Sequence, residues 1–542
     1  MVCRYCGAQA DEGDLFCAGC GAPLEEAAAG DAVSPLFSPG GSEPCGGQPP
    51  RPARGKKVPN RRSLLFSSLG ALVLLAAVAA VLLRRPGGTV TDVTRLEPDC
   101  LYLISSGENY EKMAVYSGTA LVARADASYS FDLSMDRKVF SYVDTDGTLW
   151  RVTAAGATAI TSGVERAILS DGGDAAAFQT AEGGVYLLAD TGAAPVLLSD
   201  DCALENVTLS PDGSAAAFTT GVSSSAPAGL MLSLPGKDPV MVCGQGVPLA
   251  LSDDGLLYYY QMSSVYNNRG DLYAYRDGVS TLLAERMLTE LSMSVSRNRR
   301  ELIFTSLGKC YLARGGAELI LLSEAVQLFP GTPNGAASRL LSLSNYLTVF
   351  PADSFADCVL YSQDGLYYLD ENYSCSKLTD QVYAFTLSAD RSRMLYQTRE
   401  GDFYLLPDLR GGEPARLLLH LSGCRAYDTA PDLSITYYQE SFEEGGPICS
   451  LDLSGNTALV TERAEASLLS GYTDVFYFLT DGRLHYILPG ESEIHVAASD
   501  TAVLSLFPAG PRALCYFTDG QGGWRPYCEE SPGVFVPLET AA

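Results

Sequence analysis

The longest hydrophobic stretch of the chain is Ser63–Leu83, SLLFSSLGALVLLAAVAAVLL, in which 21 consecutive residues carry no charge. An α-helix of that length rises about 31 Å, which matches the hydrocarbon core of a bilayer. Arginine pairs bracket the stretch, Arg61-Arg62 before it and Arg84-Arg85 after it. The pattern predicts a single transmembrane helix over residues 63–83.

Basic residues gather on the N-terminal side of this segment and predict its orientation. Six precede it closely and two follow it: Arg51, Arg54, Lys56, Lys57, Arg61 and Arg62, against Arg84 and Arg85. Because basic residues beside a span are retained in the cytoplasm, we expect the N-terminus inside the cell and the C-terminal body outside. The alternative is a cleaved signal peptide, whose apolar core is only about 7–15 residues long. Here 62 residues precede the apolar stretch, which favours an uncleaved anchor in the cell membrane.

From about residue 90 the pattern changes to short apolar strands separated by turns rich in Asp and Gly. The repeat is clearest at 209–218, LSPDGSAAAF, and degenerate copies start at residues 133, 169, 251, 295 and 387, at spacings of about 36–44 residues. Eight Asp-Gly pairs mark hairpin turns, where a positive φ angle is needed. A period near 40 with four strands per unit is typical of propeller blades, so we expect a mainly β fold of β-propeller-like repeats.

The LSPDGSAAAF motif is similar to the repeat of WD40-like, TolB-type propellers and of the propeller domains of prolyl oligopeptidases. The resemblance extends over roughly residues 90–540, although several copies lose the Pro, the Gly or the Asp. About eleven units can be counted, more than the usual four to eight blades of one ring. The irregular stretch 325–354 interrupts the period, which favours two tandem rings, 90–325 and 326–540. One large irregular ring is the alternative.

The first 24 residues, MVCRYCGAQADEGDLFCAGCGAPL, contain two Cys-x-x-Cys knuckles, each followed by Gly. The four thiols, Cys3, Cys6, Cys17 and Cys20, would fill the coordination sphere of one Zn²⁺ and leave no open position, so the site is structural. Metal binding would also supply the folding free energy of so short a segment. The segment resembles the zinc ribbons at the N-terminus of many bacterial membrane proteins. An iron site with four sulfurs, two disulfides or idle thiols are the alternatives. Residues 25–62 are rich in Pro, Gly and Ala and end in the basic cluster. This composition predicts a disordered linker.

The net charge of −27 is carried by the C-terminal body. Residues 1–85 hold nine Lys and Arg against seven Asp and Glu, which leaves 28 against 57 in the remainder, a net charge of about −29. Such a body would repel phosphate backbones, which argues against nucleic acid as a partner. The acidity serves solubility, or it attracts cationic ligands or divalent ions.

Candidate chemistry in the body is sparse. Cys515 and Cys528 lie symmetrically about a DGQGG turn, so direct pairing in a hairpin would allow a disulfide, and a one-residue shift of register would leave two free thiols. Asp144-Thr145-Asp146-Gly147 is either part of a calcium loop or a plain hairpin turn. The tyrosine runs Tyr258–Tyr260 and Tyr437-Tyr438 would line a ligand site or simply pack. The three histidines, His420, His485 and His495, have no ligand-spaced neighbours, and no hydrolase, phosphate-binding or metalloprotease motif is present.

These observations together predict a single-pass membrane protein of a bacterial cell envelope. The cytoplasmic zinc ribbon would present a small inner docking surface, and the extracytoplasmic propeller would bind a protein, a peptide or a cell-wall glycan without catalysing a reaction. The alternatives are a hydrolase or lyase carried by the propeller, and a structural envelope scaffold.

Overall fold

The computed structural model describes residues 97–106, 112–126, 130–190, 192–221, 228–264, 269–288, 293–324, 329–330, 353–362, 365–380, 382–398, 400–411, 413–421, 426–440, 446–497, 502–518 and 523–539. The chain divides into two compact units, Met1–Leu82 and Leu83–Ala542, and every described residue belongs to the second unit. The zinc ribbon, the linker and the transmembrane helix therefore lie outside the described residues and stay predictions. Within the described part of the chain, no helix has the length and apolar character that a membrane span requires.

Eleven antiparallel sheets follow one another along the second unit, and each is a meander of strands that are consecutive in the sequence. We number them blades 1 to 11 in chain order. Blade 1 has three strands among the described residues, β1–β3, and each of the other ten has four. The second unit is thus a β-propeller of eleven blades, which confirms the mainly β fold.

The strands of the eleven blades are two to ten residues long. Blades 1 to 4 contain β1 (Leu101–Ser106), β2 (Lys112–Ser117), β3 (Ala120–Asp126), β4 (Phe131–Leu133), β5 (Phe140–Val143), β6 (Leu149–Thr153), β7 (Gly156–Thr161), β8 (Val164–Leu169), β9 (Ala176–Thr180), β10 (Val185–Leu188), β11 (Val196–Ser199), the short 3-10 helix η1 (Leu204–Asn206), β12 (Val207–Leu209), β13 (Ala216–Thr220), β14 (Ala228–Ser233) and β15 (Val240–Cys243). Blades 5 to 8 contain β16 (Val247–Leu251), β17 (Leu257–Ser264), β18 (Arg269–Arg276), β19 (Val279–Leu288), β20 (Ser294–Val295), β21 (Glu301–Ser306), β22 (Lys309–Arg314), β23 (Glu318–Ser323), β24 (Phe329–Pro330), β25 (Cys358–Ser362), β26 (Gly365–Leu369), β27 (Cys375–Asp380), β28 (Val382–Leu387), β29 (Met394–Thr398), β30 (Asp402–Leu406) and β31 (Arg416–His420). Blades 9 to 11 contain β32 (Ala426–Thr429), β33 (Ile435–Gln439), β34 (Ile448–Asp452), β35 (Thr457–Thr461), β36 (Ala466–Leu469), β37 (Phe476–Thr480), β38 (Arg483–Ile487), β39 (His495–Val496), β40 (Val503–Ala509), β41 (Arg512–Thr518), β42 (Trp524–Ser531) and β43 (Val534–Pro537).

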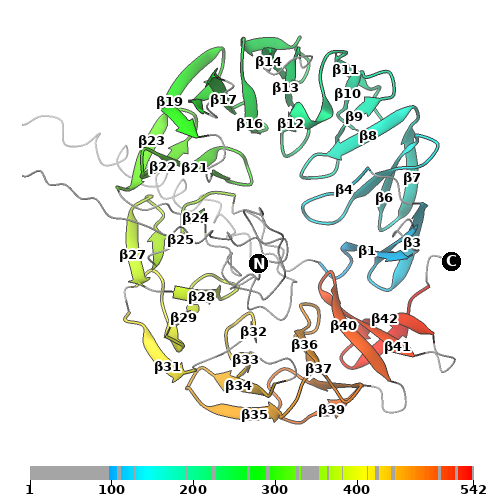
Figure 1. Ribbon diagram of the computed structural model, residues 1–542, viewed down its shortest axis with the longest axis vertical. Helices are drawn as coiled ribbons and strands as arrows, with labels where there is room; N and C mark the ends of the chain where they lie inside the picture. The colour runs from blue at the N-terminus through cyan, green and yellow to red at the C-terminus, as the bar shows by residue number, and fades with distance from the viewer. Residues whose placement is uncertain are drawn as a thin grey trace, which may run out of the picture. The chain divides into compact units, whose positions relative to one another are not determined.

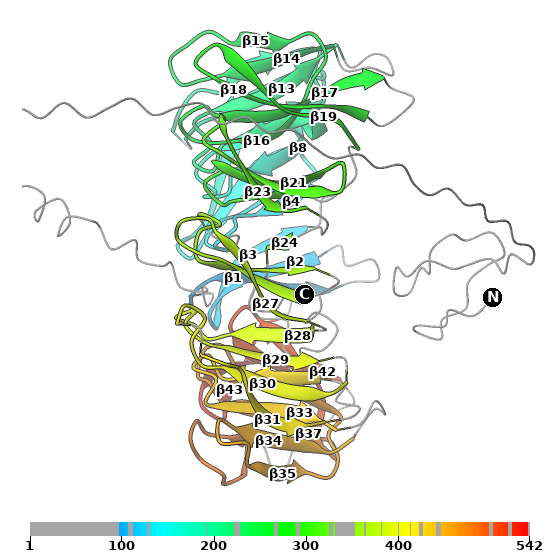
Figure 2. The ribbon, with the colours of Figure 1, turned by 90° about the vertical axis from the view of Figure 1, so that its left-hand side faces the viewer.

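The blades form one ring around a common centre, with the first strand of a blade toward the inside and the last at the rim (Figure 1). Figure 2 shows the same ring from its edge. The second strand of a blade is the most buried, as in β5, where all four residues are buried, because neighbouring blades cover both of its faces. In the rim strand β7 no residue is buried, and three of its six residues are exposed.

Hydrophobic clusters lie between neighbouring blades all the way round the ring, one for each of the eleven interfaces. The interface across the irregular stretch is not interrupted, since Leu312 of blade 6 packs in one cluster with Phe355 and Leu360 of blade 7. The last interface closes the ring, because Leu514 of blade 11 packs with Tyr116 of blade 1. The preference for two tandem rings is therefore wrong, and the alternative of one large ring is confirmed.

The repeated Leu-Ser-x-Asp-Gly motif builds the turn between the first and second strands of a blade. In blade 4 the Oγ of Ser210 donates to Oδ1 of Asp212 over 2.8 Å and accepts the backbone N–H of Ala215 over 3.0 Å. Oδ1 of Asp212 also accepts the N–H of Ser214 at 2.8 Å. Each such Ser is buried, so its hydroxyl satisfies backbone groups that water cannot reach.

The Gly of the motif has a left-handed backbone conformation in the turn. This conformation favours Gly, but larger residues adopt it in some of the other blades. Gly213 has a φ angle of 72°, and a Cβ there would lie 2.2 Å from the Cβ of Ala175 in the preceding blade. Other blades place a larger residue at the same point of the turn and keep its geometry, as Arg137, Arg299, Arg391 and Leu433 do at φ angles of 55–60°. The degenerate copies of the motif therefore form the same turn as the clearest one.

Candidate functional site

The four cysteines predicted to hold zinc, Cys3, Cys6, Cys17 and Cys20, lie outside the described residues. Their role as metal ligands stays a prediction. Among the described residues, no group of three or more His, Cys, Asp or Glu side chains is arranged to hold a metal ion.

The predicted disulfide between Cys515 and Cys528 is not formed. Strands β41 and β42 pair with Cys515 opposite Tyr527 and with Leu514 opposite Cys528, one residue away from the register that the disulfide needs. A shift of one residue turns a side chain to the other face of the sheet. Cys515 accordingly packs between blades 10 and 11 and Cys528 between blades 11 and 1, and both are free thiols.

The other candidate residues from the sequence analysis make hydrogen bonds or packing contacts within the propeller. Asp144 Oδ1 accepts the N–H groups of Asp146 and Thr148, and its Oδ2 accepts Trp150 Nε1–H at 2.7 Å, so the segment is a plain hairpin turn. Tyr258, Tyr259 and Tyr260 are each at most 2% exposed and pack in the core.

Tyr437 and Tyr438 are likewise buried, at 3% and 1% exposure. His420 and His495 pair with nearby carboxylates on the surface, Asp402 and Glu491. His485 stacks on Phe478 of the neighbouring strand, with ring centroids 5.3 Å apart. The burial of the five tyrosines agrees with the simpler interpretation, in which they pack in the core.

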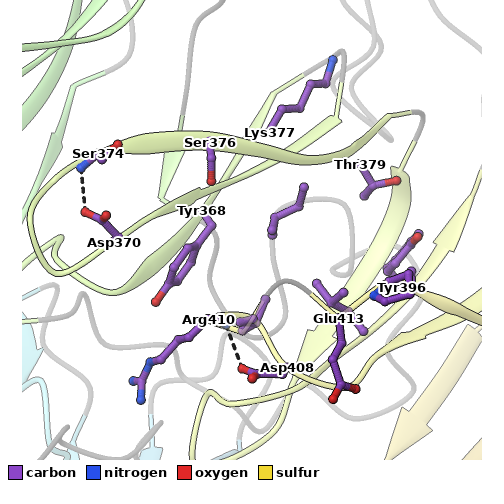
Figure 3. Close-up of a pocket in the computed structure, with 15 residues that line it drawn as sticks. Tyr368, Asp370, Ser374, Ser376, Lys377, Thr379, Tyr396, Asp408, Arg410 and Glu413 are labelled. Carbon is purple, nitrogen blue, oxygen red and sulfur yellow. Dashed lines mark hydrogen bonds between the residues drawn. The ribbon is translucent and has the colours of Figure 1, made fainter.

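Among the described residues, a groove between blades 7 and 8 is a candidate site. Its cavity has a volume of about 560 Å³, within the range of ligand-binding clefts. Strand β27 supplies one side through Ser376, Lys377 and Thr379, and the loop between β30 and β31 supplies the other through Asp408, Arg410 and Glu413 (Figure 3).

The floor of the groove is apolar and rigid. Tyr396 and Leu406 are 4% and 8% exposed and belong to the hydrophobic cluster between blades 7 and 8, together with Tyr368 and Leu409. Burial raises the pKa of the Tyr396 phenol, which therefore stays neutral at physiological pH. These residues are fixed by the packing of two blades, so the floor is preformed.

One end of the groove is held by a three-residue network. Asp357 accepts the Tyr368 hydroxyl and two N–H groups of the Arg410 guanidinium, with 3.1 Å between Arg410 Nε and Asp357 Oδ1. Burial alone would raise the pKa of Asp357, but the hydrogen bonds from Arg410 and Tyr368 outweigh it and lower the pKa below its ordinary value. The same Asp357 raises the pKa of Arg410. The network fixes the loop against blade 7.

The remaining charged groups are distributed along the two sides. Lys377 Nζ lies 2.5 Å from Asp380 Oδ1, beside the Tyr367 ring. Asp370 accepts the backbone N–H groups of Asn372 and Ser374, and its second oxygen is not used by these bonds. Hydroxyl groups and carboxylates that converge on an apolar floor can bind a ligand with both polar and apolar parts.

Three aliphatic hydroxyl groups line the groove, those of Ser374, Ser376 and Thr379, and its lining residues include no His or Cys. Among the described residues, no hydrogen bond joins one of these hydroxyl groups to a carboxylate, and Thr379 Oγ1 donates to the backbone oxygen of Asp380. Activated nucleophiles need such a partner within hydrogen-bond reach.

Reasoning from the sequence missed this groove because its residues come from two blades and form no motif. A signal was nevertheless present in LPDLRGGEPARLL, where nine residues separate β30 from β31. The corresponding connection in blade 2, between β6 and β7, has two residues. A long loop with Pro, Asp and Gly at one blade tip is a typical place for a binding function.

No protein-family model matches the chain. No curated protein matches its sequence either.

Solved structures with a similar arrangement have low identity to this chain. A eukaryotic initiation factor gives a TM-score of 0.38 at 10% identity and covers 67% of this chain and 97% of its own. The xyloglucanase of glycoside hydrolase family 74 from Xanthomonas campestris gives 0.27 at 11% identity, with 81% and 84% covered. Dipeptidyl peptidase 4 of Porphyromonas gingivalis gives 0.29 at 12% identity, with 64% of each chain covered. These scores carry no argument about function.

Proposed function

We propose that this chain is a membrane-anchored binding protein, in which the eleven-bladed propeller recognises a protein, peptide or cell-wall glycan through the groove between blades 7 and 8. The N-terminal zinc ribbon lies in the cytoplasm, the helix over 63–83 crosses the membrane, and the propeller faces outward. The proposal gives the groove a binding role, and a hydrolase or lyase carried by the propeller is the alternative, in which its carboxylates would act as acid and base.

The observation that carries the proposal is the construction of the groove. Its floor of Tyr396 and Leu406 is buried and its walls are polar, which is the composition of a preformed ligand cleft. The network of Asp357, Tyr368 and Arg410 holds one wall in place before a ligand arrives. Preorganisation of this kind reduces the entropy lost on binding.

A photo-crosslinking amino acid at Ser376 tests the proposal in the full chain within its native membrane. Ser376 is exposed and lines the groove, whereas Thr158 is exposed on the rim strand β7 of blade 2 and serves as the matched control. We expect a discrete adduct from position 376 and none from position 158. The same adducts from both positions, or none from either, would refute a specific site in the groove.

A further inference from the structure

The two cationic side chains of the groove are already neutralised by carboxylates beside it. The Arg410 guanidinium donates two hydrogen bonds to Asp357. Lys377 Nζ lies 2.5 Å from Asp380 Oδ1. An anionic ligand would therefore have to compete with Asp357 and Asp380 for these two cations.

The carboxylates that line the groove have no cationic partner among the residues that the structure describes. Asp370 accepts only backbone N–H groups in the described structure, from Asn372 and Ser374 at 2.8 and 2.7 Å. Asp408 Oδ1 accepts the backbone N–H of Arg410 at 2.9 Å, and Glu413 is exposed at the edge. Within the described residues, none of these three carboxylates lies in an ion pair with Lys, Arg or His.

The positions of the three carboxylates and of the apolar residues around the cavity indicate which kind of side chain could bind there. Asp408 and Glu413 lie together at one wall and Asp370 lies toward the other end (Figure 3). Tyr396, Leu406 and Leu409 line the same cavity and supply its apolar surface. A Lys or Arg side chain combines a long aliphatic stem with a cationic head, so its stem can lie on the floor while its head reaches a carboxylate.

The loop conformation keeps one of these carboxylates at the wall. A Cβ at Gly411 would lie 1.9 Å from Oδ2 of Asp408, so a larger residue there would push the Asp408 carboxylate aside.

We propose, resting on the function proposed above, that the groove recognises Lys or Arg side chains carried by an extended segment of a protein partner. Asp370, Asp408 and Glu413 receive the cationic heads, and the apolar floor receives the stems. The acidic body, with a net charge of about −29 beyond residue 85, adds a long-range attraction for the same partner. The surrounding charge would affect the association rate, whereas the three carboxylates decide where the segment binds.

Two capped decapeptides serve as probes for the full chain in detergent, one alternating Gly and Lys and the other alternating Gly and Glu. Calorimetry should show binding of the lysine peptide alone, weakening at least about tenfold when salt rises from about 0.05 to about 0.5 M. The triple variant Asp370→Asn, Asp408→Asn, Glu413→Gln should lose at least about tenfold in affinity, since charge-assisted hydrogen bonds are lost. Glu493→Gln, which removes an exposed carboxylate of blade 10, is the matched control and should bind as the parent chain does.

Each outcome separates this inference from the proposed function. Equal binding of the two peptides, or a triple variant that binds the lysine peptide as the parent chain does, overturns the inference. If the lysine peptide fails to bind while the crosslinker at Ser376 still captures a partner, the cationic ligand is excluded and the groove keeps its function. If both fail, both proposals fall. An unchanged unfolding temperature of the triple variant shows that a lost affinity is not lost folding.

Discussion

Arg299 donates a hydrogen bond from Nη2 to Oδ2 of Asp171 over 2.7 Å, although 128 positions separate the two residues in the chain. Arg299 lies in the first turn of blade 6 and Asp171 in that of blade 3. Two further bonds link the turns between them, from Gly172 N–H to Pro211 O and from Asp212 N–H to Asp253 Oδ1. The turns between the first and second strands of blades 3 to 6 are therefore linked to one another by hydrogen bonds. No local pattern in the sequence encodes these contacts between blades.

The turn glycine of blade 4 should be irreplaceable for a steric reason. Gly213→Ala places a methyl group against Ala175 and forces a left-handed residue, and we expect a loss of about 3 kcal/mol in the free energy of unfolding. Gly236→Ala is the control, because its φ angle of 65° is similar but no atom lies within 4 Å of the added Cβ. That variant should lose only about 1 kcal/mol. Equal losses in urea unfolding would show that backbone strain alone matters.

The buried carboxylate of Glu529 should hold blades 10 and 11 together. It is 0% exposed and accepts hydrogen bonds from Ser470 Oγ at 2.6 Å and Tyr477 OH at 2.8 Å, from Thr473 Oγ1, and from the backbone N–H of Ala513 at 3.0 Å. Glu529→Ala leaves these donors buried without an acceptor, so we expect a loss of about 3 kcal/mol or more. The exposed neighbour Glu530, changed to Gln, should leave the midpoint of thermal unfolding unchanged. A Glu529→Ala chain as stable as the parent would contradict this role.

The aspartates in the turns between the first and second strands of the blades should make the folded chain less stable in acid. Hydrogen bonds from Ser388 and from the Ser392 backbone lower the pKa of Asp390 from its ordinary value of 3.8 to about 2. Because the folded chain holds this carboxylate ionised, the contribution is complete above about pH 4 and is lost as the pH falls through about 2.

An asparagine provides the matched test of that contribution. Asn298 makes the corresponding hydrogen bonds in blade 6, to Ser296 Oγ and Arg300 N–H, so Asp390→Asn should fold with the same turn. The parent chain should be more stable than this variant at pH 7, and the difference should shrink as the pH falls from 4 toward 2. A difference that stays constant over this range in urea unfolding would show that the charge of Asp390 has no role.

Both cysteines of the last hairpin should behave as buried free thiols. Burial raises the pKa of Cys528 to about 11 and that of Cys515 well above its ordinary value, so the reactive thiolates are scarce at neutral pH. We expect alkylation of neither thiol in the folded chain and of both after unfolding, read by peptide mass spectrometry. Recovery of a non-reduced peptide pair joining the two residues would contradict the observed register.

The sequence predicted the blades more successfully than their closure. The Ser and Asp of LSPDG recur because each forms local hydrogen bonds, so the period of the repeat and the mainly β fold could be inferred. The number of rings could not, since it depends on whether Phe355 packs on Leu312 across an irregular stretch, which is a contact between distant segments. The pairing register of strands β41 and β42 could not be inferred either. A shift of one residue decides whether Cys515 lies opposite Cys528 or Tyr527.

Hydrogen–deuterium exchange of the full chain with and without the lysine decapeptide tests the central claim most directly. The claim is that a lysine-bearing segment binds in the groove between blades 7 and 8, and it predicts slower exchange in residues 365–380 and 400–415 with no change in the rim strand β7 of blade 2. Unchanged exchange in both groove segments, or protection confined to another blade, would contradict it.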